Sequence, residues 1–195
     1  MILPNLSKYR IVLASNSPRR KELLAGLDID FTVRTQSGID ESYPSHLTGE
    51  DIPLYICRQK SKAYQASMAS DELIITADTV VLSDGQVLGK PHSEDEARRM
   101  LHRLSGRTHE VTTGVSVTTV DKQSCFAVTS RVSFACLTEE EIDYYVNRYH
   151  PLDKAGAYGI QEWIGFIGVD GLSGSYFNVM GLPVQRLYTV LKNEF

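Results

Sequence analysis

The run LIITADTVVL at 73–82 constrains this chain more than any other segment. Nearly every residue in it is apolar or β-branched, as is typical of a strand buried on both faces. Asp78 interrupts the run, and the apolar residues resume at Val80. A carboxylate in such surroundings is costly to bury unless it meets a metal ion, another cation or several hydrogen-bond donors. Asp78 is therefore either a functional acid inside the fold or the centre of a simple turn.

The segments around this run predict an α/β fold, with a mixed twisted sheet and flanking helices. We expect further strands at 10–14, 31–35, 108–120 and 124–135, the last two paired antiparallel, and a hairpin turn at Asp84-Gly85. Helices are expected at 17–26, 51–69, 93–104, 138–147 and 183–192, three of them opened by cap signals at Ser17, Ser93 and Thr138. The polar segment 38–49 is typical of a loop. A length of 195 residues suits one domain over 1–195.

Composition excludes several classes of protein. The formal net charge of -4 and the pI of about 5.7 argue against a general nucleic-acid binder, which needs a surplus of Lys and Arg. The N-terminus lacks the apolar stretch of a secretory signal, and no run approaches the ~20 apolar residues of a membrane span. The cysteines, Cys57, Cys125 and Cys136, are widely spaced, which supports neither a disulfide framework nor a zinc site. We expect buried thiols and a cytoplasmic protein.

The segment from Ser15 to Arg20 is a candidate phosphate site. A strand runs into a tight polar loop and then a helix, so free backbone N–H groups and the positive end of the helix dipole face outward together. Ser15 and Ser17 add hydroxyls, and Arg19 and Arg20 add guanidinium groups suited to phosphate oxygens. The alternative is an ordinary capped helix with solvated charges. The loop is not a Walker A motif.

Further acidic and basic residues are candidate partners of Asp78 in a phosphate site. Asp40-Glu41 is either a solvated acidic loop tip or the source of a second carboxylate, since Mg²⁺ in phosphate sites is usually held by one or two carboxylates. Lys62, Lys90 and Lys154 are each either solvated or able to neutralise phosphate charge. No Ser/His/Asp or Cys/His arrangement supports a covalent mechanism.

Eight motifs in order give the chain a resemblance to a known family. They are ASNSPRR (14–20), GIDE (38–41), KSKA (60–63), ADTVV (77–81), GKP (89–91), LSGRTHEVTTGV (104–115), DKAGAYGIQ (153–161) and GSYFNVMGLP (174–183). Over nearly its whole length the chain resembles the Maf-like nucleoside triphosphate pyrophosphatases. The resemblance implies two lobes around a deep cleft, a fold similar to the inosine triphosphate pyrophosphatases, a divalent cation (Mg²⁺ or Mn²⁺), a homodimer, and hydrolysis of nucleotides to the monophosphate and pyrophosphate.

The resemblance also assigns roles to residues. Asp78 matches the family's catalytic proton acceptor and Glu41 its partner acidic residue, both as metal ligands, and Lys62 and Lys90 match catalytic lysines. Substrate contacts are expected from Ser15, Arg19, Arg20, Thr79, Lys154 and Gln161.

At three of these positions the chain has Arg19, Thr79 and Gln161. These residues resemble those of the branch of the family that acts on dTTP and UTP and so cleanses nucleotide pools. The amide of Gln161 both donates and accepts, which matches the edge of uracil or thymine. Two alternatives stay open: a 7-methyl-GTP pyrophosphatase, and a regulator of cell division that binds nucleotides without turnover.

Overall fold

The computed structural model describes residues 3–195, which form two compact units. The first unit consists of the described residues up to Asp78 together with Thr113–Val128 and Gly181–Phe195. The second unit consists of Thr79–Thr112 and Thr129–Met180. Three strands contribute residues to both units, namely β3 (Glu72–Ser83), β5 (Thr108–Thr118) and β6 (Gln123–Phe134). Each unit is described in turn, by its own strands and helices.

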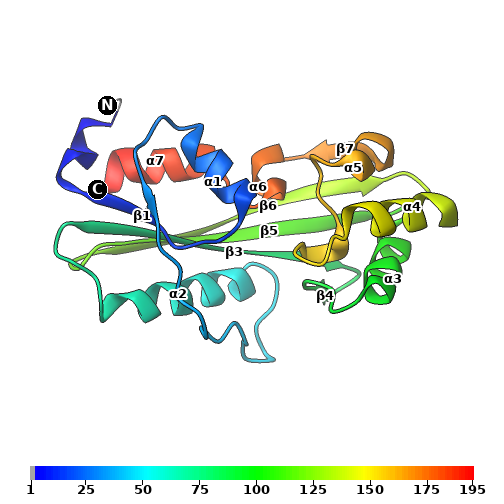
Figure 1. Ribbon diagram of the computed structural model, residues 1–195, viewed down its shortest axis with the longest axis horizontal. Helices are drawn as coiled ribbons and strands as arrows, with labels where there is room; N and C mark the ends of the chain where they lie inside the picture. Colours follow the sequence, from blue (N-terminus) through cyan, green and yellow to red (C-terminus); the bar gives the residue numbers. More distant parts are fainter. Residues whose placement is uncertain (1–2) are drawn as a thin grey trace. The chain divides into compact units, whose positions relative to one another are not determined.

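The first unit orders its strands β2-β1-β3-β5-β6. β1 (Arg10–Leu13) pairs in parallel with both β2 (Thr32–Val33) and β3. Parallel neighbours require crossover connections, and here these carry α1 (Pro18–Ala25) and α2 (Asp51–Gln65). Figure 1 shows α1 and α7 (Val184–Glu194) on one side of these strands and α2 on the other. A short 3₁₀-helix, η1 (Pro4–Lys8), precedes β1.

Helix α2 lies directly against the sheet. A side chain at Gly114 of β5 would place its Cβ 2.5 Å from the backbone of Pro53, so only glycine permits this approach. Near the other end of the helix Tyr64 packs in one apolar cluster with Ile74 of β3. Thr76, two residues further along β3, donates a hydrogen bond to the carbonyl of Cys57 at 2.7 Å. One face of β3 is thereby turned toward α2, and Asp78 is the next residue on that face.

The second unit orders its strands β4-β3-β5-β6-β7. β4 (Gln86–Leu88) pairs antiparallel with β3, and β7 (Val169–Ser173) pairs antiparallel with β6. Cross-strand hydrogen bonds join Thr108 to Ser133 and Thr112 to Thr129, a progression in opposite directions that makes β5 and β6 antiparallel. The sheet is therefore mixed, as predicted. The helical segments are α3 (Glu94–Leu104), α4 (Glu139–Tyr149), η2 (Ala155–Ala157), α5 (Trp163–Gly168) and α6 (Tyr176–Met180).

Most predicted elements are confirmed. Ser17 caps α1 by accepting a hydrogen bond from the Arg20 N–H, and Thr138 and Glu141 form a complete capping box at α4. At α3 the predicted box is only half formed: Ser93 accepts from the Glu96 N–H, but the Glu96 carboxylate accepts from His92 instead. The predicted strand at 31–35 shrinks to the two residues of β2, and the helix predicted to reach residue 69 ends at Gln65.

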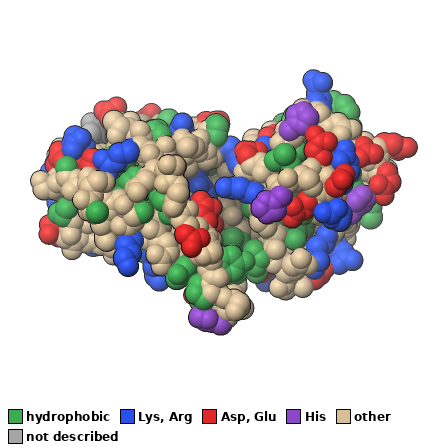
Figure 2. All heavy atoms as spheres, turned by 60° about the horizontal axis from the view of Figure 1, so that its bottom comes forward, with side chains coloured by type: hydrophobic (Ala, Val, Ile, Leu, Met, Phe, Trp, Pro, Cys, Tyr) green, Lys and Arg blue, Asp and Glu red, His purple; other side chains and the backbone are tan. Residues whose placement is uncertain are grey.

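The expectation of buried thiols is only partly correct. Cys57 is buried, but Cys125 is half-buried and Cys136 is exposed, because the latter two lie in and just after the partly solvated strand β6. Figure 2 shows Lys and Arg side chains interspersed with Asp and Glu on the visible face. Among the described residues, no helix is long and apolar enough to cross a membrane.

Candidate active site

A buried lysine joins the two acidic residues that the sequence singled out. The Lys60 ammonium of α2 lies 2.7 Å from Asp78 Oδ1 and 3.0 Å from Glu41 Oε1. The side chains of Lys60 and Asp78 are only 11% and 12% exposed, whereas Glu41 is 49% exposed. Asp78 is therefore a buried, ion-paired acid within β3 and not the centre of a turn. The ion pair resolves the cost of placing its carboxylate in an apolar run.

The helical period explains why Lys60 takes this place. Ile52, Ile56, Lys60 and Tyr64 recur every four residues and are all buried, so they form the stripe of α2 that faces the sheet. Lys62 lies about 200° around the helix from Lys60, and its side chain is exposed. Sequence reasoning selected Lys62 from the KSKA motif and missed Lys60. The missed signal was a lysine in register with the apolar stripe.

The N-terminus of α1 contributes Arg20 to the same charged neighbourhood. Arg20 donates from Nε to the carbonyl of Gly181 at 2.9 Å. Burial lowers the pKa of the Arg20 guanidinium, while the negative charges of Asp78 and Glu41 oppose that shift. Asp78 and Glu41 thus lie near enough to Arg20 for their charges to act on it. Arg20 is thus a permanent positive charge beside the two carboxylates.

The loop before α1 is ordered by its own hydroxyls. Ser15 is buried, and its Oγ accepts a hydrogen bond from the Ser17 N–H at 3.2 Å. Arg19 is half-buried. In the loop after β2, Asp40 turns to the N–H and hydroxyl of Ser42, which hold the pKa of its carboxyl below the usual range. Of the Asp40-Glu41 pair, only Glu41 therefore faces Lys60.

The remaining predicted site residues belong to the second unit. Thr79 is half-buried in β3, directly after Asp78, and Lys90 is exposed after β4. The Gly156 N–H donates to the carbonyl of Gly89 at 3.1 Å, so the segments that carry Lys90 and Lys154 lie side by side. Lys154 itself is buried and ion-paired, at 2.7 Å from Asp153 and 3.1 Å from Glu162.

Gln161 carries an unsatisfied buried acceptor. Its side chain is half-buried, and its Oε1 atom is buried without a hydrogen-bond partner among residues 3–195. Buried polar atoms in native proteins almost always have partners, and an exception calls for an explanation such as a ligand. The amide oxygen of Gln161 is accordingly an acceptor that residues 3–195 leave unused and that is shielded from solvent in this conformation.

The donor set of Glu41 and Asp78 fits a divalent cation. The two carboxylates already converge on one positive charge, that of Lys60, and each has a second oxygen. Within the described part of the chain, no group of three or more His, Cys, Asp or Glu residues could hold a metal ion. Mg²⁺, however, usually binds through one or two carboxylates together with substrate phosphates and waters. Two carboxylates are therefore sufficient for a metal that arrives with a nucleotide.

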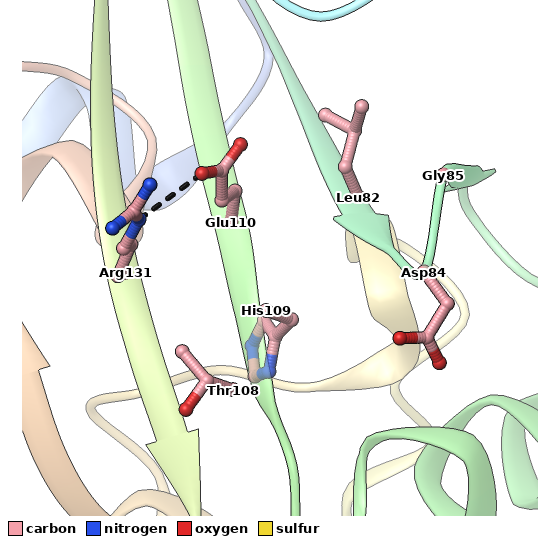
Figure 3. A pocket seen from close by; sticks show the side chains of 7 residues that line it. All are labelled: Leu82, Asp84, Gly85, Thr108, His109, Glu110 and Arg131. Atoms are coloured by element: carbon pink, nitrogen blue, oxygen red, sulfur yellow. Dashed lines mark hydrogen bonds and ion pairs between the residues drawn. The ribbon is translucent and has the colours of Figure 1, made fainter.

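The second unit also contains a pocket of about 370 Å³ that includes none of the predicted site residues (Figure 3). Its lining consists of Leu82, Asp84, Gly85, Thr108, His109, Glu110 and Arg131. Glu110 and Arg131 pair with each other at 3.1 Å. His109 is buried, bonds Tyr158 through Nε2 at 2.7 Å, and has its pKa lowered to about 4 by desolvation. Asp84 pairs with Arg107, which does not line the pocket. The carboxylates and the guanidinium of the lining are thus ion-paired, and burial keeps His109 from gaining a charge.

Comparisons with known proteins place this arrangement in a family. The Maf-like protein family matches residues 10–194. A dTTP/UTP pyrophosphatase of Phocaeicola vulgatus is 65% identical over 98% of this chain and 99% of its own length. One of Flavobacterium psychrophilum is 42% identical over 100% and 99% of the two chains.

A solved structure supports the same fold. The HAM1 protein from Coxiella burnetii is 17% identical and covers 94% of this chain and 98% of its own, with a TM-score of 0.50. The likeness supports the expected similarity to the inosine triphosphate pyrophosphatase fold. The family match over residues 10–194 and the close curated relatives lead to one conclusion: the chain belongs to the Maf-like proteins.

Proposed function

We propose that this protein hydrolyses nucleoside triphosphates, with dTTP and UTP preferred, to the monophosphate and pyrophosphate. The observation that carries the proposal is the pair of carboxylates, Glu41 and Asp78, gathered around Lys60 in the neighbourhood of Arg20. Such a set can both position a cation and neutralise phosphate charge. The relatives named dTTP/UTP pyrophosphatase, which match at up to 65% identity, supply the reaction and the base preference.

We infer that Glu41 and Asp78 hold a divalent cation, Mg²⁺ or Mn²⁺. When bound, the ion supplies positive charge to the phosphate oxygens and makes a water molecule more acidic. Support comes from the convergence of the two carboxylates on one positive charge.

Residues of the chain accept the proton of the attacking water and neutralise charge on the phosphates. A water molecule attacks the α-phosphorus, its proton passes to the Asp78 carboxylate, and the bond between the α-phosphorus and the bridging oxygen breaks to release pyrophosphate. Lys60 and Arg20 neutralise the negative charge that grows on the departing pyrophosphate. This electrostatic contribution is the main source of catalysis in phosphoryl transfer.

Substrate contacts follow the same logic. The N–H groups at the start of α1, together with Ser15, would bind phosphate oxygens. Arg19, Thr79, Lys90 and Lys154 remain proposed contacts from their motifs. Gln161 would read the base, because its unsatisfied Oε1 can accept the N3–H of uracil or thymine. A 7-methylguanine base also carries a ring N–H group, at N1, so the preference for dTTP and UTP rests on the names of the relatives and not on this acceptor alone.

Asp78→Asn tests the proposed reaction. Asparagine keeps the size of the side chain but can neither accept a proton from water nor hold a cation strongly. We expect kcat for pyrophosphate release to fall by a factor of about 10³ or more, on the scale of lost electrostatic and acid-base catalysis. The far-ultraviolet circular dichroism spectrum should stay unchanged. Activity within threefold of the wild type would refute the assignment and leave open a nucleotide-binding regulator.

Two further expectations stay predictions. A cytoplasmic location suits an enzyme of nucleotide pools and a chain with three free cysteines. The homodimer rests on the family resemblance alone, and a monomeric mass by light scattering of the purified protein would contradict it.

A further inference from the structure

The turn that carries Gln161 is closed by hydrogen bonds. The Glu162 N–H donates to the carbonyl of Gly159 at 2.9 Å, which makes 159–162 a β-turn with Gln161 at its third position. The same turn leads into α5, where the Gly165 N–H donates to the carbonyl of Glu162 at 2.8 Å. A Cβ at Gly159 would lie 3.0 Å from Nε2 of Gln161 and 2.9 Å from the carboxyl carbon of Glu162. The two side chains are thus packed over the start of the turn.

Tyr145 of α4 bridges the two ends of this turn. Its hydroxyl accepts the Gly159 N–H at 3.0 Å and donates to the Glu162 carboxylate in a short hydrogen bond. Burial and the neighbouring carboxylate raise the pKa of Tyr145, so the hydroxyl keeps the proton that it donates. The ring of Tyr145 is fully buried and stacks on Tyr149 at 5.0 Å. One hydroxyl on a fixed helix therefore fastens both the first and the last residue of the turn.

Lys154 holds the other oxygen of the same carboxylate. Its ammonium lies 3.1 Å from Glu162 Oε1 and 2.7 Å from Asp153 Oδ1, and its side chain is 8% exposed. Glu162 is thus fixed at one oxygen by Tyr145 and at the other by Lys154. A carboxylate held at both oxygens by buried groups has little freedom to rotate. Because Glu162 is the last residue of the turn, its fixed side chain also restricts the backbone there.

We propose that Tyr145 and Glu162 are positioning residues that hold Gln161 in place to read the pyrimidine base, with Lys154 bracing Glu162. The inference rests on the proposed function, since Gln161 must contact the base. Precise orientation matters because a site that reads a base by hydrogen bonds discriminates only when its donors and acceptors are held in the matching geometry. Tyr145 and Glu162 themselves need not touch the nucleotide.

Tyr145→Phe tests the inference, because it removes one hydroxyl and leaves the stacked ring. We expect KM for dTTP and UTP to rise roughly tenfold with kcat within about threefold, as when binding shared by ground and transition states is lost. The kinetics for dATP, whose base does not match Gln161, should change by less than about threefold. Glu162→Gln, which weakens the hold of Lys154, should shift selectivity in the same direction. Tyr149→Phe removes a hydroxyl one turn along the same helix and should leave selectivity unchanged.

A double-mutant cycle separates positioning from general damage. In a Gln161→Ala background Tyr145→Phe should cause no further loss of selectivity for dTTP over dATP, because its effect passes through Gln161. The inference is overturned if the losses of selectivity in the two single variants multiply in the double variant. It is also overturned if Tyr145→Phe reduces kcat/KM equally for dTTP and dATP, or if it leaves the selectivity unchanged. Calorimetry with the α,β-imido analogues of dTTP and dATP gives the ratio of their dissociation constants, which measures the same selectivity by binding alone. If the wild type releases no pyrophosphate, the proposed function fails, and these binding ratios still decide the positioning role.

Discussion

At the scale of single residues, an unusual neighbourhood was the strongest clue to the site. Asp78 was predictable because a carboxylate inside an apolar, β-branched run needs a partner, and the structure supplies Lys60. Glu41 was predictable only through the motif, since an acidic residue in a polar loop is common. The orphaned Oε1 of Gln161 could not be predicted at all, because burial of one atom depends on the packing of segments distant in sequence.

His109 makes a prediction about pH. Burial lowers its pKa from 6.5 to about 4 in the folded protein. Between these values the unfolded chain binds the proton that the folded protein excludes. The contribution of His109 is therefore fully present above about pH 6.5 and is lost as the pH falls toward 4. We expect the loss of free energy of unfolding between pH 7 and pH 4 to include about 3 kcal/mol from this residue.

The control for this prediction is His109→Gln, whose amide can still bond Tyr158 but does not titrate. Urea unfolding of both proteins at pH 7, 5.5 and 4 gives the comparison. The wild type should lose more stability than the variant over this interval. Equal losses in the two proteins would show that His109 is not excluded from protonation.

At the scale of elements, regular periodicity was readable and irregular segments were not. The cap signals at Ser17 and Thr138 located α1 and α4 because side-chain caps act within one helical turn. By contrast α5, β7 and α6 lie in a glycine-rich stretch without a clear period, and tertiary pairing with β6 determines β7. Helix α2 was predicted as an element, yet the residues that face the sheet were not, so the ion pairs of Lys60 were not foreseen.

Helix α2 therefore provides a matched pair of variants. Lys60→Ala removes the ammonium between the two carboxylates, whereas Lys62→Ala removes an exposed charge two residues away on the same helix. We expect Lys60→Ala to lower kcat by about 10² or more, and Lys62→Ala to stay within about threefold. Steady-state pyrophosphate release with dTTP gives both values. The opposite order would restore the role that the KSKA motif suggested for Lys62.

At the scale of the whole molecule, the ordered motifs predicted more than any local pattern. Local chemistry around Ser15–Arg20, Glu41 and Asp78 indicated only a phosphate site with a metal ion. The family match over residues 10–194 confirms the family, and the likeness to the HAM1 protein supports the mixed α/β architecture. The division into two compact units, each formed by segments distant in sequence, was not readable from composition, because the same three long strands serve both.

The most direct test of the account is a nucleotide panel assayed for pyrophosphate release. Purified protein is given dTTP, UTP, CTP, dATP, GTP and 7-methyl-GTP with Mg²⁺ or Mn²⁺, and kcat/KM is measured for each, with orthophosphate recorded in parallel. We predict pyrophosphate as the product, loss of turnover on chelation of the metal, and the highest kcat/KM for dTTP and UTP. Preference for 7-methyl-GTP would contradict the base assignment, and orthophosphate as the initial product would contradict the reaction itself.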